Sequence, residues 1–162
     1  MRLWRTIAVP AVTAALALAT TAVPAQAAPV RACAGQAGVF NACLTIEGTL
    51  TPNVWRVTAG LDRYMSQAAC EAILPVGEFG GALYSNDDGF LDELTLAWVA
   101  CGPAGLGVEF VEDEPYYVLD EDTDGKDELY AKINYFNPTT GRSEVYQTGL
   151  VQKEFRKGIP VD

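Results

Sequence analysis

Apolar and polar residues alternate along most of the chain from residue 39 onwards. This alternation predicts β-strands, because successive side chains of a strand point to opposite faces of the sheet. The predicted strands cover residues 39–49, 54–61, 79 to an acidic turn near 87, 94–101, 107–112, 116–119, 129–136 and 144–151. The more apolar face of the segment 129–136, which is the predicted core face, carries Leu129, Ala131, Ile133 and Tyr135.

The segment 94–101 is apolar on both faces, as is typical of a strand in the middle of a sheet. Under simple alternation, one face carries Leu94, Leu96, Trp98 and Ala100. The other face carries Thr95, Ala97, Val99 and Cys101. Gly102-Pro103 ends the run, and we expect a central strand here.

One segment departs from the strand pattern and predicts a short helix over 66–73. Ser66 is an expected N-cap, Gln67-Ala68-Ala69 fit a first turn, and Pro75 stops the helix. About eight short strands with one helix predict a mainly β fold, namely an antiparallel β-sandwich or an open barrel. We expect one such domain over residues 39–162, preceded by a flexible Ala- and Gly-rich arm over 28–38.

Residues 1–27 have the organisation of a secretory signal peptide. Arg2 and Arg5 form a basic start, an apolar run follows over 7–23, and Ala25-Gln26-Ala27 offers a small-x-small cleavage site. Pro10 and several threonines interrupt the run, which does not fit a membrane-spanning helix. We therefore expect cleavage after Ala27 and a secreted, extracellular protein without a membrane span.

The four cysteines, Cys33, Cys43, Cys70 and Cys101, all follow the predicted cleavage site. An even number of cysteines in an exported chain predicts two disulfides, for which three connectivities are possible. The pairs Cys33–Cys43 and Cys70–Cys101 are favoured, because the first closes a short loop and the second ties the helix to a core strand. Zinc is the rival explanation, but the chain has no C-x-x-C pair and no histidine.

The formal charge of −10 becomes −12 without Arg2 and Arg5, which disfavours nucleic acid and anionic membranes as partners. The acids are concentrated between Tyr84 and Tyr130, which enclose 14 carboxylates and a single base, Lys126. This part of the chain is where a cation would be attracted.

Within the acidic part, Asp120-Glu121-Asp122-Thr123-Asp124-Gly125-Lys126-Asp127-Glu128 places carboxylates at positions 1, 3, 5 and 9 and glycine at position 6. This loop resembles those of EF-hand and integrin-type FG-GAP calcium sites. The resemblance implies a calcium ion held by the side chains of Asp120, Asp122, Asp124 and Glu128 and by the carbonyl of Lys126. Position 12 is Ala131 instead of the EF-hand glutamate, and strands are predicted on both sides, so the FG-GAP-type loop is the nearer match. A solvated acidic turn that binds nothing specific is the alternative.

A second acidic turn with Asp87, Asp88, Asp92 and Glu93 aligns with the first at an offset of 35 residues. The alignment of 84–94 with 119–129 has two explanations, duplication or chance identity. It predicts a strand, an acidic turn and a strand in both copies. The second turn would complete the calcium site if the two turns meet at one end of the fold.

Candidate catalytic residues are few. The absence of histidine excludes Ser-His-Asp and Cys-His arrangements, and no serine of the mature chain lies in a known nucleophile motif. A carboxylate pair of the glycosidase type remains possible, with Glu109, Glu112 and Glu114 as candidates. We therefore expect a monomeric extracellular module that binds a protein or glycan without catalysis, with a small carboxylate-dependent hydrolase as the alternative.

Overall fold

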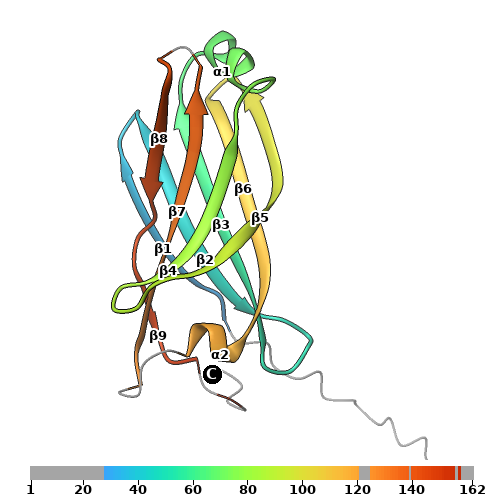
Figure 1. Ribbon diagram of the computed structural model, residues 1–162, viewed down its shortest axis with the longest axis vertical. Coiled ribbons are helices and arrows are strands. Elements are labelled where there is room, and N and C mark those ends of the chain that lie inside the picture. The colour runs from blue at the N-terminus through green and yellow to red at the C-terminus, as the bar shows by residue number, and fades with distance from the viewer. Residues whose placement is uncertain (1–27, 121–124, 139, 156, 158–162) are drawn as a thin grey trace, which may run out of the picture.

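The computed structural model describes residues 28–120, 125–138, 140–155 and 157. Within these residues the fold is mainly β and entirely antiparallel, as predicted. Two short helices accompany the strands (Figure 1). In chain order the elements are β1 (Val30–Gln36), β2 (Phe40–Gly48), β3 (Val54–Tyr64), α1 (Gln67–Ile73), β4 (Phe79–Ser85), β5 (Gly89–Gly102), β6 (Gly105–Pro115), α2 (Tyr116–Leu119), β7 (Asp127–Asn137), β8 (Arg142–Gln147) and β9 (Val151–Lys153).

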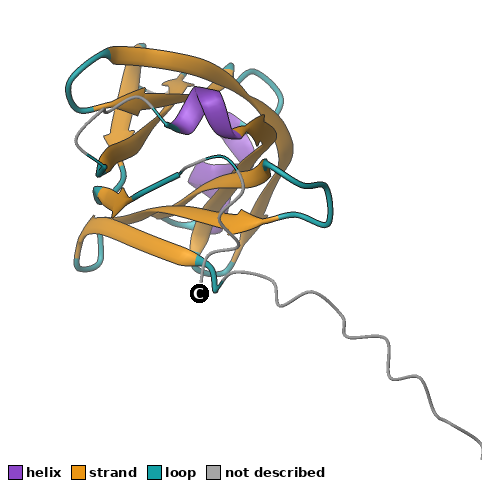
Figure 2. Ribbon diagram, turned by 90° about the horizontal axis from the view of Figure 1, so that it is seen from below, coloured by secondary structure: helices purple, strands orange, loops and turns teal. Residues whose placement is uncertain are grey.

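The strands follow the order β1-β2-β3-β6-β5-β4-β7-β8, with β9 paired to the other end of β7. Strand β5 turns the sheet around a corner, because its first half pairs with β4 up to Leu94 and its second half pairs with β6 from Thr95. The result is a strongly curled half-barrel (Figure 2). The predicted central position of this strand is therefore confirmed.

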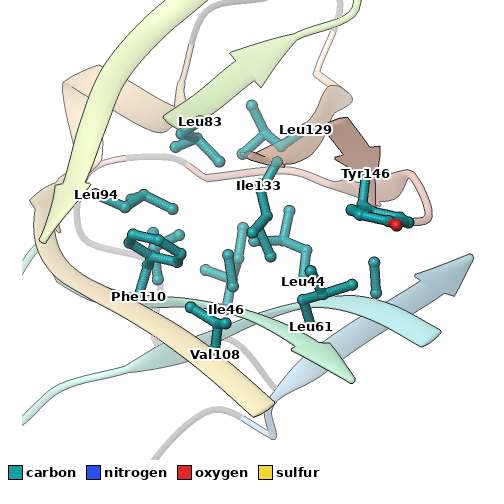
Figure 3. Close-up of a cluster of buried hydrophobic side chains, with 14 of the residues drawn as sticks. Leu44, Ile46, Leu61, Leu83, Leu94, Val108, Phe110, Leu129, Ile133 and Tyr146 are labelled. Atoms are coloured by element: carbon teal, nitrogen blue, oxygen red, sulfur yellow. The ribbon is translucent and has the colours of Figure 1, made fainter. Parts of the chain in front are cut away.

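The core lies inside the curl, where apolar side chains from facing strands meet (Figure 3). The predicted core face of β7 is confirmed: Leu129, Ala131, Ile133 and Tyr135 are each 0% exposed. Opposite them, β2, β3 and β6 contribute Leu44, Ile46, Val57, Leu61, Val108 and Phe110. Burying such side chains supplies the main favourable free energy of folding.

Helix α1 covers one end of the half-barrel (Figure 1). Ser66 caps it as predicted, with its hydroxyl accepting a hydrogen bond from the Ala69 N–H at 3.2 Å. Both predicted disulfides are present: Cys70–Cys101 ties α1 to β5, and Cys33–Cys43 joins directly opposed residues of β1 and β2.

Three predicted segments are wrong in detail. The expected flexible arm over 28–38 contains β1, which pairs residue by residue with β2 and is thereby ordered. The segment 116–119 is helix α2 instead of a strand, because it follows Pro115 past the end of the sheet, where the Tyr116 N–H donates to the Asn53 carbonyl. The strand over 144–151 is split into β8 and β9 at Thr148, whose hydroxyl accepts from the Ala131 N–H at 2.9 Å.

Candidate functional site

The β4–β5 turn and the start of β7 meet at the end of the half-barrel that carries α2 (Figure 1). Ser85, the last residue of β4, pairs with Leu129 of β7. Beyond this pair, the Asn86 N–H donates to the Glu128 carbonyl at 2.8 Å. The β4–β5 turn with Asp87 and Asp88 therefore abuts the last residue of the predicted calcium loop.

The described part of the predicted calcium site comprises Asp120, Lys126 and Glu128, while Asp122 and Asp124 lie outside the described residues. Asp120 is the C-cap of α2 and is half-buried, and Lys126 is exposed. Among the described residues, no three acidic or cysteine side chains are grouped closely enough to hold a metal ion.

The Glu128 carboxylate is held in place by two amide donors. Gln152 Nε2 donates to Oε1 at 2.6 Å, and Asn86 Nδ2 donates to Oε2 at 3.2 Å. A carboxylate offers about four lone-pair positions, so these two bonds leave room for a cation. The side chain fits the role of a calcium ligand oriented by two neighbouring amides.

Asp127, which the loop pattern does not include among the ligands, is the buried carboxylate of this loop. It is 2% exposed, and its Oδ2 accepts the Phe155 N–H at 3.0 Å. Phe155 packs edge-on against Trp55, so Asp127 fixes the C-terminal segment to the core. The strand alternation that places Leu129 inside could have identified it, because Asp127 lies two residues earlier on the same face.

The internal alignment does not correspond to two similar structural units. Residues 84–94 form the predicted hairpin of β4 and β5. In the second copy, the described residues show helix α2 ending at Leu119, where the alignment predicts the first strand, and β7 beginning at Asp127. The prediction of strand, acidic turn and strand is therefore wrong for the second copy.

Apart from the two acidic turns, three carboxylates lie together where β5 separates from β6. They belong to Asp92, Glu112 and Glu114. The last β5–β6 pair at this end is Thr95 with Val111, so these three carboxylates line the point of divergence. Thr95 Oγ1 donates to Glu112 Oε2 at 2.7 Å. Glu109, the other glutamate considered for catalysis, lies outside this group, opposite Trp98.

Glu114 is the unusual member of this group. It is 3% exposed, and its Oε1 has no hydrogen-bond partner among the described residues. Burial, reinforced by the negative charges of Asp92 and Glu112, raises the pKa of Glu114 to about 7. A carboxyl whose pKa lies near neutral pH can act as a general acid.

A third carboxylate, Glu144, has the opposite environment. Burial by itself would raise its pKa, but hydrogen bonds from Tyr146, Asn137 and Tyr135 and the charge of Arg63 hold the pKa below its usual value. Glu144 therefore stays ionised, and its contacts link β7, β8 and β3. This arrangement is typical of a structural network.

Comparison with known proteins adds no relationship to this picture. No family model, no curated protein and no solved structure matches the chain. Within the described residues, neither helix has the length and apolar character needed to cross a membrane.

Proposed function

We propose that the protein is a secreted extracellular module that binds a protein or glycan without catalysing a reaction, and that calcium stabilises its loop over 120–128. The observation that carries the calcium part is the contact between Asn86 and Glu128, which brings the second acidic turn against the loop. Carboxylates crowded into one loop repel one another, and a divalent cation that binds them relieves that repulsion.

The proposed ligands are the side chains of Asp120, Asp122, Asp124 and Glu128 with the carbonyl of Lys126. Oxygen donors of this kind suit calcium, a hard cation with six to eight ligands. Magnesium would stabilise less, because it requires a smaller octahedral shell and keeps its waters. The two disulfides support the extracellular location, since such bonds persist in oxidising compartments.

The test is a melting curve of the secreted protein in chelator, in millimolar calcium and in millimolar magnesium. At a hundredfold excess of calcium over its dissociation constant, we expect about 2.7 kcal/mol of added stability. Asp122→Ala should lose this gain. Glu78→Gln removes one charge from an exposed residue outside both turns, and this variant should keep the calcium-dependent gain in stability. An unchanged wild-type midpoint, or an equal gain in Asp122→Ala, would contradict the proposal.

A second candidate function is a small carboxylate-dependent hydrolase, and the raised pKa of Glu114 beside Asp92 and Glu112 favours it. Glu114 would donate the proton to the leaving group, and one of the other two would act as base or nucleophile. The test is a hydrolysis screen on extracellular polysaccharides and peptidoglycan. Turnover that is lost in Glu114→Gln but kept in Glu71→Gln would favour the hydrolase over the binding module.

A further inference from the structure

A β-bulge in β5 reverses the direction of the side chains that follow it. The register with β6 shifts between Leu96 and Trp98. Leu94, before the bulge, is buried, whereas Val99 and Cys101, after it, pack against the core. The predicted face shared by Leu94 and Trp98 is therefore wrong, because the bulge turns Trp98 to the outer surface. Bulges often re-aim a side chain in this way near functional sites.

Trp98 keeps 46% of its surface exposed and extends over a glycine of the neighbouring strand. A methyl group at position 107 would come within 2.9 Å of Trp98 Cη2 and within 3.9 Å of Asp62 Oδ1. Gly107 therefore lies directly beneath the indole, and a side chain at this position would displace the ring. Gly60 on β3 provides a second position without a side chain, opposite Glu109.

Two carboxylates flank the exposed indole. Glu109 is paired directly with Trp98, and Asp62 is paired with Gly107. From Gly107, a shallow hollow of about 270 Å³ runs along β3 and β6 past Tyr64, which is 40% exposed. Arg63 also borders this hollow, but its guanidinium donates to Tyr146 and to backbone carbonyls.

We propose that Trp98, Asp62 and Glu109 form a binding site for a glycan that carries free amino groups. The inference rests on the proposed role as a binding module and specifies its partner. The apolar face of a sugar ring can pack on the exposed part of the indole, while the carboxylates accept hydrogen bonds from its hydroxyl and ammonium groups. An ammonium group is also attracted to the indole face. The same carboxylates repel sulfated and uronic glycans.

The test is a tryptophan fluorescence titration of the secreted protein with a β-1,4-linked glucosamine tetramer. The other ligands are its N-acetylated form, a heparin tetrasaccharide and tetralysine. We expect the glucosamine tetramer to bind more tightly than the other ligands. Added salt should weaken its binding. Failure to bind it, or equal or tighter binding of any other ligand, would overturn the proposal.

Variants locate the site, with binding measured by calorimetry. Trp98→Ala should weaken binding by about tenfold or more, and Asp62→Asn and Glu109→Gln should each weaken it several-fold. Gly107→Val keeps every binding group but displaces the indole, and it should lose binding too. Val145→Ala, a control at an exposed position of β8, should bind normally. Unchanged binding by Trp98→Ala would overturn the site.

The calcium-dependent melting shift separates the two proposals. Trp98→Ala should keep the calcium shift of the wild type. A calcium shift without glucosamine binding would overturn the glycan site alone. Glucosamine binding without a calcium shift would overturn the calcium site alone.

Discussion

Arg63 Nε donates a hydrogen bond to Tyr146 Oη at 2.7 Å and thereby connects β3 with β8, two strands that share no backbone ladder. The guanidinium also donates to the Val39 carbonyl at 2.9 Å. Tyr146 in turn donates to Glu144, and its ring packs against Phe40 of β2. Side chains therefore join β8, at one end of the strand order, to β2 and β3 near the other end.

Removing the hydroxyl in Tyr146→Phe should lower the free energy of unfolding by about 2 kcal/mol. The ring contacts remain in this variant, but Arg63 and Glu144 each lose a partner in a half-buried site. Arg56→Met is the matched control, because the Arg56–Asp113 pair is exposed and such pairs contribute about 1 kcal/mol or less. Urea denaturation measures the free energy of unfolding of both variants. Equal losses in the two would contradict the stabilising role of the Arg63–Tyr146 contact.

Stability should fall as the pH rises from about 5 to 8, because Glu114 is buried. Its pKa of about 7 in the folded protein lies above the ordinary value of 4.5, so over this range the unfolded chain releases its proton first. The buried, protonated form of Glu114 therefore contributes to the free energy of unfolding at the lower pH, and this contribution is lost as the pH rises. We expect a loss on the order of 1 to 2 kcal/mol over this range.

Glu114→Gln should flatten this pH dependence and make the protein more stable than the wild type at pH 8. Glu112→Gln, which removes a more exposed carboxylate of the same group, should keep most of the slope. Denaturation curves at pH 5, 6.5 and 8 measure the effect. A wild-type slope that persists in Glu114→Gln would show that another group titrates.

The two disulfides should contribute unequally to stability. Cys70–Cys101 closes a loop with a sequence separation of 31, and Cys33–Cys43 closes one of 10. A longer loop restricts the unfolded chain more, which predicts a difference of about 1 kcal/mol from loop entropy. Thermal melting of the two double alanine variants tests this. A larger loss from removal of Cys33–Cys43 would contradict it.

Gly81→Ala should destabilise the protein by about 2 kcal/mol or more, because the new methyl group would lie 2.5 Å from the Phe110 ring. Phe110 is 1% exposed and has little space to move. Gly102→Ala is the control, since a methyl group there meets no atom within 4 Å in the described structure. Guanidinium denaturation of both variants gives the comparison, and equal stability would contradict the packing argument.

Local signals in the sequence were sufficient for several parts of this protein. The alternation over 129–136 determined which side of β7 is buried, because a strand has only two faces. The N-cap and the proline determined α1, since capping depends on near neighbours. The cysteine spacing supported both disulfides. For the candidate calcium site, the sequence supplied the loop residues, and calcium binding there stays a prediction.

The remaining features depend on residues far apart in the chain, so only the tertiary structure decided them. Pairing with β2 orders β1, whose own sequence shows no strand pattern. Where β5 diverges from β6, Glu114 is buried, and its Oε1 accepts no hydrogen bond from any described residue. A one-residue shift between the same strands turns Trp98 outward. A single sequence lists these side chains but does not specify which strand lies beside which. Their burial and direction depend on the strand register, which is set when the whole sheet assembles.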